Sequence, residues 1–297
     1  MDNAESSVAL QLYTRGERYL RFHELAAAEE SLREALRHDN RHAQSWYLLG
    51  MVYSEMGRIA EARKCFGEAL THAPGWLRPM EQLGRLEYAQ HCYVECVNIL
   101  KDYFRQGGAD PDVMKILARA AHSIGNYEVA LSVTSIILES NEDDYEMWEL
   151  RGLCQAAMGK FNAASVSLNI AIDINPDSIS ALNHVGDICY ESDNYLRAVE
   201  FYEMSLAKKP EQKEILFRCA TALWFVGRWN EAIPILERYV QLVQDDPKGW
   251  NNLGIALREK GHIKRAIESL NKALSLDPDN PVIRNNISTA TNKQALK

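Results

Sequence analysis

One pattern recurs along this sequence every 34 residues, and no insertion interrupts it. Small residues stand at fixed places in the pattern, with large apolar residues between them. A repeat of this length is typical of chains that stack one supersecondary unit on the next, because a single unit cannot bury its own apolar face. Counting from Ala9, eight units follow one another: 9–42, 43–76, 77–110, 111–144, 145–178, 179–212, 213–246 and 247–280.

Two positions of the unit hold only small side chains. Position 8 holds Gly16, Gly50, Gly84, Ala118, Gly152, Gly186, Ala220 and Gly254. Position 20 holds Ala28, Ala62, Cys96, Ala130, Ala164, Ala198, Ala232 and Ala266. Two helices can approach closely only where their side chains are small, since protein interiors are close-packed. We therefore expect each unit to contain two helices that cross at positions 8 and 20.

Other positions define the helices and their ends. In unit 43–76, Trp46, Leu49, Gly50 and Tyr53 follow the spacing i, i+3, i+4, i+7 of an amphipathic helix. Glycine is frequent at position 15, where a chain that leaves a helix often needs a left-handed residue. Proline is frequent at position 32, where it ends a helix. Each unit is thus predicted to form one helical hairpin.

The unit resembles the tetratricopeptide repeat family. Unit 43–76 meets the family's signature in full, with Trp46, Leu49, Gly50, Tyr53, Ala62, Phe66, Ala69 and Pro74. Units 145–178 and 247–280 are also close to it. Unit 77–110 departs most, with Met80, Cys96, Tyr103 and Gly108, so we expect a splayed hairpin or a mobile loop there. The resemblance implies an all-α fold, an α-solenoid in which helical hairpins form a right-handed superhelix.

The uninterrupted register favours one superhelical domain over residues 9–280, with unit 77–110 as its weakest joint. Residues 1–8 are expected to form an N-terminal tail. Residues 281–297 are polar apart from a few positions, which suits a solvated capping helix better than a ninth repeat that has lost its second helix.

Composition narrows the classes of function. The net charge of −8 argues against a surface built to neutralise nucleic-acid phosphates or anionic lipid. No apolar run is long enough to span a membrane, and the first residues lack the pattern of a secretory signal. Six cysteines are too sparse for a disulfide scaffold. We expect a cytoplasmic protein with reduced thiols, no nucleic-acid partner and no membrane insertion.

No local signature of nucleotide, zinc or serine chemistry occurs in the sequence, so we expect neither an enzyme nor a cofactor. His91, Cys92 and Cys96 offer three metal-ligand types close together. Position 20 points Cys96 into the helix crossing, however, and no fourth ligand is evident. A structural role is favoured for all three, and no metal is expected.

A repeat array of this kind is suited to binding, and the family resemblance implies that first helices line a concave surface. Positions 2, 5, 6, 9, 12 and 13 of these first helices are not used for packing, so they are available to bind a partner. In the third and fourth units these positions are locally basic, with Arg78, Arg85, Lys115, Arg119 and His122 against Glu81 and Asp112. The later units are rich in amides and aromatic rings: Asn183, His184, Tyr190, Phe217, Arg218, Trp224, Asn251, Asn252 and Asn286.

Two interpretations of these polar side chains remain open. They could bind the backbone of an extended peptide, because amides both donate and accept hydrogen bonds. They could equally be the solvated wall that any superhelix needs. The carboxylate clamp by which a subclass of the family holds chaperone tails is absent, since Lys115 and Arg119 are followed in the next units by Leu150, Ser180 and His184.

The leading hypothesis is a non-enzymatic scaffold or adaptor that binds an extended segment or a helix of a partner protein in its groove. The alternative is a self-assembling structural scaffold. A less favoured hypothesis is the substrate-binding arm of a larger enzyme complex, as in glycosyltransferases whose repeat arrays are lined with asparagine.

Overall fold

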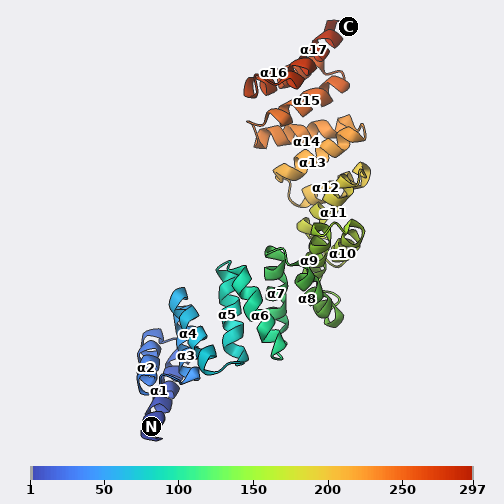
Figure 1. Cartoon of the computed structure of the whole chain (residues 1–297). Coiled ribbons are helices and arrows are strands. Elements are labelled where there is room, and N and C mark those ends of the chain that lie inside the picture. The colour runs from blue at the N-terminus through green and yellow to red at the C-terminus, as the bar shows by residue number, and fades with distance from the viewer. Residues whose placement is uncertain (1–2, 296–297) are drawn as a thin grey trace. The chain divides into compact units, whose positions relative to one another are not determined.

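The computed structural model describes the backbone of residues 3–295 and the side chains of residues 7–292. The described residues form seventeen helices and no strand (Figure 1). The helices are α1 (Asn3–Arg21), α2 (Leu25–His38), α3 (Ala43–Glu55), α4 (Ile59–His72), α5 (Leu77–Ala89), α6 (Tyr93–Arg105), α7 (Pro111–Ser123), α8 (Tyr127–Ser140), α9 (Tyr145–Ala157), α10 (Phe161–Ile174), α11 (Ile179–Glu191), α12 (Tyr195–Lys208), α13 (Lys213–Phe225), α14 (Trp229–Leu242), α15 (Pro247–Glu259), α16 (Ile263–Leu276) and α17 (Pro281–Ala295).

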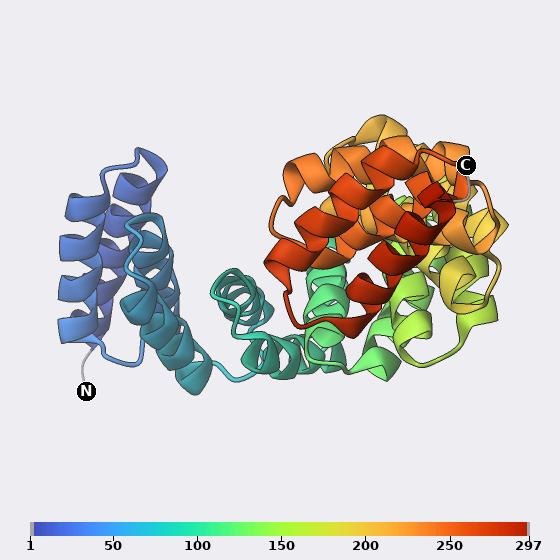
Figure 2. The same ribbon diagram turned by 90° about the horizontal axis from the view of Figure 1, so that it is seen from above.

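The helices pair as the repeat predicts. Each 34-residue unit contains a first helix, a short turn and a second helix, and the two helices of a unit pack against each other (Figure 2). The second helix of each unit then packs against the first helix of the next within a compact unit, as α2 does on α3 and α12 on α13. The all-α solenoid expected from the sequence is confirmed.

The crossing of the two helices leaves no room at position 8. A Cβ atom placed on Gly50 would lie 2.6 Å from Cε1 of Phe66, and one on Gly186 would lie 2.6 Å from Cε1 of Tyr202. Ala62 and Ala198, at position 20 of the same units, are fully buried. Large side chains of the second helix can therefore pack between the two helices only because positions 8 and 20 hold small residues.

The turn between the two helices has the same backbone conformation in all eight units. Position 15 has a positive φ at Gly57, Gly125, Gly159, Gly227 and Gly261. The remaining three units adopt it without glycine, at His23, His91 and Asp193, with φ between 58° and 59°. The turn thus requires a positive φ at position 15. Glycine adopts this φ readily, and other residues can adopt it at a conformational cost of roughly 1 kcal/mol.

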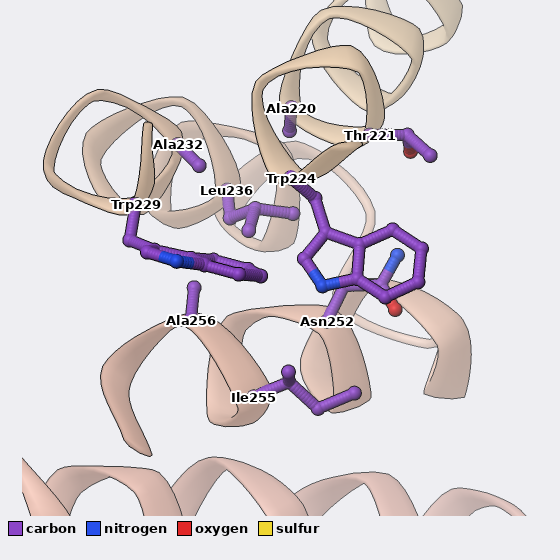
Figure 3. Close-up of a pocket in the computed structure, with 9 residues that line it drawn as sticks. All are labelled: Ala220, Thr221, Trp224, Trp229, Ala232, Leu236, Asn252, Ile255 and Ala256. Carbon is purple, nitrogen blue, oxygen red and sulfur yellow. The ribbon is translucent and has the colours of Figure 1, made fainter. Parts of the chain in front are cut away.

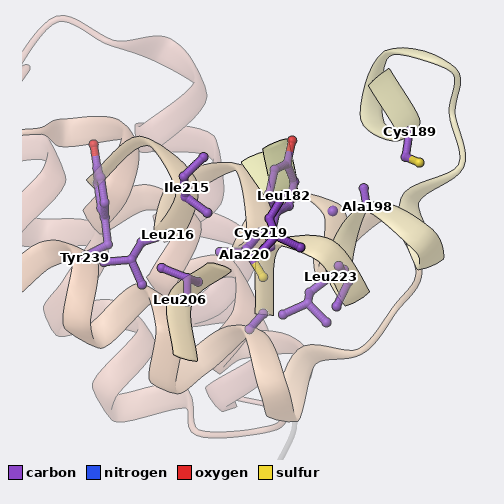
Figure 4. Packing of buried hydrophobic residues seen from close by; sticks show 14 of the residues in the cluster. Leu182, Cys189, Ala198, Leu206, Ile215, Leu216, Cys219, Ala220, Leu223 and Tyr239 are labelled. Atoms are coloured by element: carbon purple, nitrogen blue, oxygen red, sulfur yellow. The ribbon is translucent and has the colours of Figure 1, made fainter. Parts of the chain in front are cut away.

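The apolar core runs through the hairpins. In residues 143–297 it includes Leu182, Leu216 and Leu223 (Figure 4). These three residues and Tyr202 of the same cluster are fully buried. Cys219 lies in the same cluster, and burial raises the pKa of its thiol to about 12. The thiol is therefore protonated at neutral pH and packs as a small apolar group.

Unit 77–110 is regular despite its departures from the family pattern. Its helices α5 and α6 pack on each other, and they also pack on α4 and α7 respectively. The two unusual residues at its end are complementary, because a Cβ atom on Gly108 would lie 2.2 Å from Cε1 of the buried Tyr103. The large ring occupies the space that a side chain at position 32 would need, and the hairpin is not splayed.

The chain divides into two compact units, residues 1–142 and 143–297. The division falls between the fourth and fifth repeats, whereas the sequence favoured one domain with its weakest joint at 77–110. Hairpin packing is continuous inside each unit, so the periodic sequence does not mark the boundary.

The two ends are helical where they are described. Residues 3–8, expected as a tail, belong to α1. The segment expected as a capping helix contains α17, which packs on α15 and α16 and buries Ile283 and Ala290. The predictions for residues 1–2 and 296–297 lie outside the described residues. None of the described helices is long and apolar enough to span a membrane.

Two alanine substitutions in hairpin 43–76 should have opposite effects on stability. Gly67 lies in α4 with open space around its Cα, so Gly67→Ala gains helix propensity and stabilises the protein by up to about 1 kcal/mol. Gly50→Ala brings a methyl group against Phe66, and overpacking leaves a net loss of about 1 kcal/mol. Urea denaturation of both variants checks this, and a stabilising Gly50→Ala would contradict the tight crossing.

Stability should fall in mild acid through His42. Its Nδ1 atom accepts a hydrogen bond from the Ser45 backbone N–H at 3.2 Å and so caps α3. Burial lowers the pKa of His42 from its usual 6.5. Below that pH the unfolded chain takes up a proton that the folded chain resists, so the free energy of unfolding declines as pH falls.

The matched variant is His42→Asn, which keeps a capping acceptor but does not titrate. Urea denaturation at about pH 7.5 and about pH 5.5 should show a smaller loss for the variant than for the natural chain. Equal losses in the two proteins would show that His42 does not contribute.

Candidate functional site

The first helices lie on the inner side of each stack of hairpins. Four pairs of neighbouring first helices contact each other, namely α1 with α3, α5 with α7, α9 with α11 and α15 with α17. Among the described residues, no two second helices of neighbouring hairpins show comparable contact. Helices that touch their equivalents lie on the side with the shorter spacing, and the family resemblance assigns positions 2, 5, 6, 9, 12 and 13 of the first helices to this side. We call this the inner face.

Three of the predicted asparagines meet on the inner face of residues 143–297. The Asn286 Nδ2 atom donates a hydrogen bond to Asn251 Oδ1 at 2.9 Å, and Asn251 Nδ2 lies 3.5 Å from Asn252 Oδ1. Two of these amides, Asn251 and Asn252, line a groove that is open to solvent, and Asn286 reaches its border through the hydrogen bond to Asn251. The groove is lined by Phe217, Pro247, Lys248, Asn251, Asn252, Asp277, Asn280, Val282 and Ile283.

Asn183 and His184 do not join this amide cluster. The Asn183 Nδ2 atom donates to Gln212 Oε1 at 2.9 Å, and the His184 Nδ1 atom lies 2.7 Å from the carbonyl of Ser180 in its own helix. The Asn183 Oδ1 atom is buried and has no hydrogen-bond partner. The polar side chains predicted on the later first helices therefore do not form one connected row.

Arg218 braces two hairpins. Its Nη1 atom lies 3.2 Å from Asp187 Oδ1 and 3.8 Å from Glu191 Oε1. Asp187 also accepts a hydrogen bond at 2.6 Å from the hydroxyl of Tyr202, which is fully buried. Burial, together with this hydrogen bond to a carboxylate, raises the pKa of Tyr202, so the phenol remains a donor. The arginine is thus part of the structure of α11 and α13, and removing it changes more than a surface charge.

The predicted aromatic residues gather with others that the sequence did not single out. Trp224 and Trp229 border a small pocket that Asn252 and Ile255 also line (Figure 3). Phe225, at position 13, was overlooked although it belongs to the same inward stripe. Trp229 lies at the start of the second helix, where the spacing of first-helix residues gives no signal. Phe217 lies against Tyr239, with ring centroids 5.2 Å apart.

The basic stretch predicted in residues 1–142 lies on the adjacent helices α5 and α7. Arg85 is paired, because its Nε atom donates to Glu81 Oε1 at 3.0 Å and its Nη2 atom lies 3.7 Å from Asp110. Arg78 is exposed on α5, whereas Lys115 and Arg119 are half-buried on α7. The ring of His122 lies 5.8 Å from that of Tyr127. Carboxylates thus balance part of the positive charge.

Metal-ligating side chains do not cluster in the part of the chain that the structure describes, where no group of three or more His, Cys, Asp or Glu could hold an ion. Cys96 is buried, and burial raises the pKa of its thiol to about 12. A neutral thiol in the helix crossing is a poor metal ligand.

Comparison with known families settles the nature of the hairpins. The family model described as "Tetratricopeptide repeat" matches residues 43–76 and 247–280, which are the bounds of the second and eighth units. These two hairpins are tetratricopeptide repeats, and the other hairpins of the chain follow the same 34-residue frame. Proteins of this family mediate protein–protein interactions.

Relatives and solved structures agree with the assignment. Superkiller complex protein 3 of Mus musculus is 23% identical over 247 residues, which cover 76% of this chain and 15% of the relative. The C-terminal part of a TPR repeat-containing protein from Cytophaga hutchinsonii has a TM-score of 0.65 at 15% identity and covers 81% of this chain and 99% of its own. YrrB, described as a TPR protein with an unusual peptide-binding site, has a TM-score of 0.57 at 18% identity and covers 64% and 97%. These likenesses show the fold.

The contacts of Arg218 and Asp187 predict which of two alanine substitutions destabilises the protein more. Arg218→Ala should cost at most about 1 kcal/mol, because the ion pair is partly exposed. Asp187→Ala should cost more, about 1–3 kcal/mol, because the buried Tyr202 hydroxyl loses its acceptor. Urea denaturation measures both, and Tyr202→Phe should reduce the penalty of Asp187→Ala. The reverse ranking would show that the tyrosine does not depend on Asp187.

Proposed function

We propose that this chain is a non-enzymatic interaction scaffold that binds an extended segment or a helix of a partner protein on the inner face of residues 143–297. The observation that carries the proposal is the open groove, where the amides of Asn251, Asn252 and Asn280 line the same surface as apolar side chains.

The chemistry of this groove suits a polypeptide. An extended backbone presents N–H and C=O groups in alternation, and an asparagine amide can donate to one and accept from the other. Phe217 and Val282 supply apolar surface beside the amides. Asn252 borders both this groove and the pocket at Trp224, so one side chain connects a polar and an aromatic surface.

Similarity to other proteins supports a protein partner. YrrB shares the fold and is described as having a peptide-binding site, and the mouse relative is named as a protein of a complex. This chain spans only 15% of that relative's length, so the likeness concerns the repeat array.

The test uses peptides selected against the full chain from a random displayed library. Selected peptides should bind the natural chain, and Lys248→Ala combined with Asn252→Ala should weaken binding about tenfold, because both side chains line the groove. Arg218 is left intact because of its structural role. Isothermal titration calorimetry gives the affinities.

The matched control is Lys264→Ala combined with Asn271→Ala. It removes the same two residue types from exposed places on α16, the second helix of the same hairpin. Binding should be unchanged in this control. Equal loss in both double variants, or none in the groove variant, would place the binding site elsewhere.

A further inference from the structure

Four aromatic residues form a cluster on residues 143–297, which we call the aromatic patch: the half-buried Tyr190 and Tyr195 and the exposed Trp224 and Phe225. Trp224 is 44% exposed and Phe225 is 50% exposed. Large rings gathered on a surface are typical of interaction sites, because water solvates them poorly. Three of the four belong to the inner face, and Tyr195 begins α12 beside them.

The patch is held in a defined geometry. The rings of Tyr195 and Phe225 are stacked, with centroids 4.3 Å apart and planes inclined by 13°. Tyr190 meets Tyr195 edge-on at 5.3 Å, and Trp224 lies 4.9 Å from Phe225. Because the rings fix one another, they form a platform whose exposed faces are already arranged for a ligand.

An aspartate in a left-handed turn anchors the platform. The hydroxyl of Tyr195 donates to Asp193 Oδ1 at 2.5 Å, and this hydrogen bond raises the pKa of Tyr195 to about 12. Asp193 has φ 58° at the turn position where five other hairpins have glycine. The aspartate therefore keeps an unfavourable backbone conformation while it fixes the ring that stacks on Phe225.

The charge around the patch is negative. Glu191 follows Tyr190 directly, and Asp193 lies two residues farther on. The nearest inner-face arginine, Arg218, is closer to Asp187 than to Glu191. At the edge of the patch, Arg228 is hydrogen-bonded to Glu231. The aromatic faces therefore lie among carboxylates whose neighbouring arginines already have partners.

The inner face of the same compact unit is acidic as a whole. Among the side chains that the structure describes, its six acidic residues outnumber its three basic ones, and two of those three, Arg218 and Arg258, are bonded to carboxylates. The acidic residues are Glu146, Glu149, Asp187, Glu191, Glu214 and Glu259, and the third basic residue is Lys248. A positively charged segment is thus the complementary occupant.

We propose that the aromatic patch receives an arginine side chain from a basic segment of the partner, with Glu191 as its ion-pair acceptor. The proposal rests on the proposed function, since it names the kind of segment that the inner face binds. Arginine fits better than lysine because its planar guanidinium can stack on an aromatic face while its edge donates to a carboxylate. An acidic segment would be repelled.

The experiment titrates the full chain with three short fluorescein-labelled peptides in which glycine alternates with arginine, lysine or glutamate. Fluorescence anisotropy at low salt should rank the affinities arginine first, lysine second and glutamate last. Trp224→Ala combined with Phe225→Ala should weaken the arginine peptide about tenfold. Glu191→Gln should weaken it severalfold without altering the exposed rings.

Phe161→Ala is the matched control, because this aromatic residue is 46% exposed but starts the second helix α10. The Phe161→Ala variant should bind the arginine peptide as the natural chain does. This result would distinguish binding at the aromatic patch from general attraction between a cationic peptide and an acidic protein. Helical circular dichroism of each variant verifies folding.

The inference is overturned if the glutamate peptide binds as well as the arginine peptide, or if the arginine peptide binds both the Trp224/Phe225 variant and the Glu191→Gln variant undiminished. Library-selected peptides that need Lys248 and Asn252 while the arginine peptide fails to bind would overturn this inference alone. The absence of any peptide that needs the inner face would overturn both proposals.

Discussion

The architecture depends on the close crossing of two helices at a position where no side chain larger than a methyl group is present. A Cβ atom on Gly50 or Gly186 would meet the ring that fills its hairpin, and the facing alanines are fully buried. Because the crossing is close, each hairpin is thin, and its remaining apolar surface must be buried by neighbours. The hairpins therefore stack on one another. The inner-face positions of the first helices take no part in this stacking and can contact a partner.

Much of this architecture could be predicted from the sequence because its causes act within one unit. Steric exclusion at Gly50, helical spacing at Trp46 and the turn at Gly57 each involve residues of a single hairpin. Compensation between residues was harder to see. Tyr103 and Gly108 look like two departures from the pattern when taken separately, yet their contact keeps the hairpin regular.

The inner face could be predicted only in part. Asn251 and Asn286 were expected there, and the structure brings them into hydrogen-bond contact. The structural role of Arg218 could not be predicted, because its partner Asp187 belongs to the preceding hairpin, together with Tyr202. Whether Arg218 reaches Asp187 depends on how the two hairpins are tilted against each other. Tyr195 escaped notice for a related reason, since it starts a second helix and reaches Phe225 only through the stacking of two hairpins.

At Asp193, the residue that would best stabilise the fold differs from the residue that best supports the aromatic patch. A designer who replaced each unit by the consensus of the eight would put glycine there and relax the left-handed backbone. The same change would remove the acceptor that holds Tyr195, and with it the support beneath the stacked rings. An idealised version of this array could therefore melt at a higher temperature and still be a poorer receptor, because the departure from regularity is what distinguishes this hairpin from its neighbours.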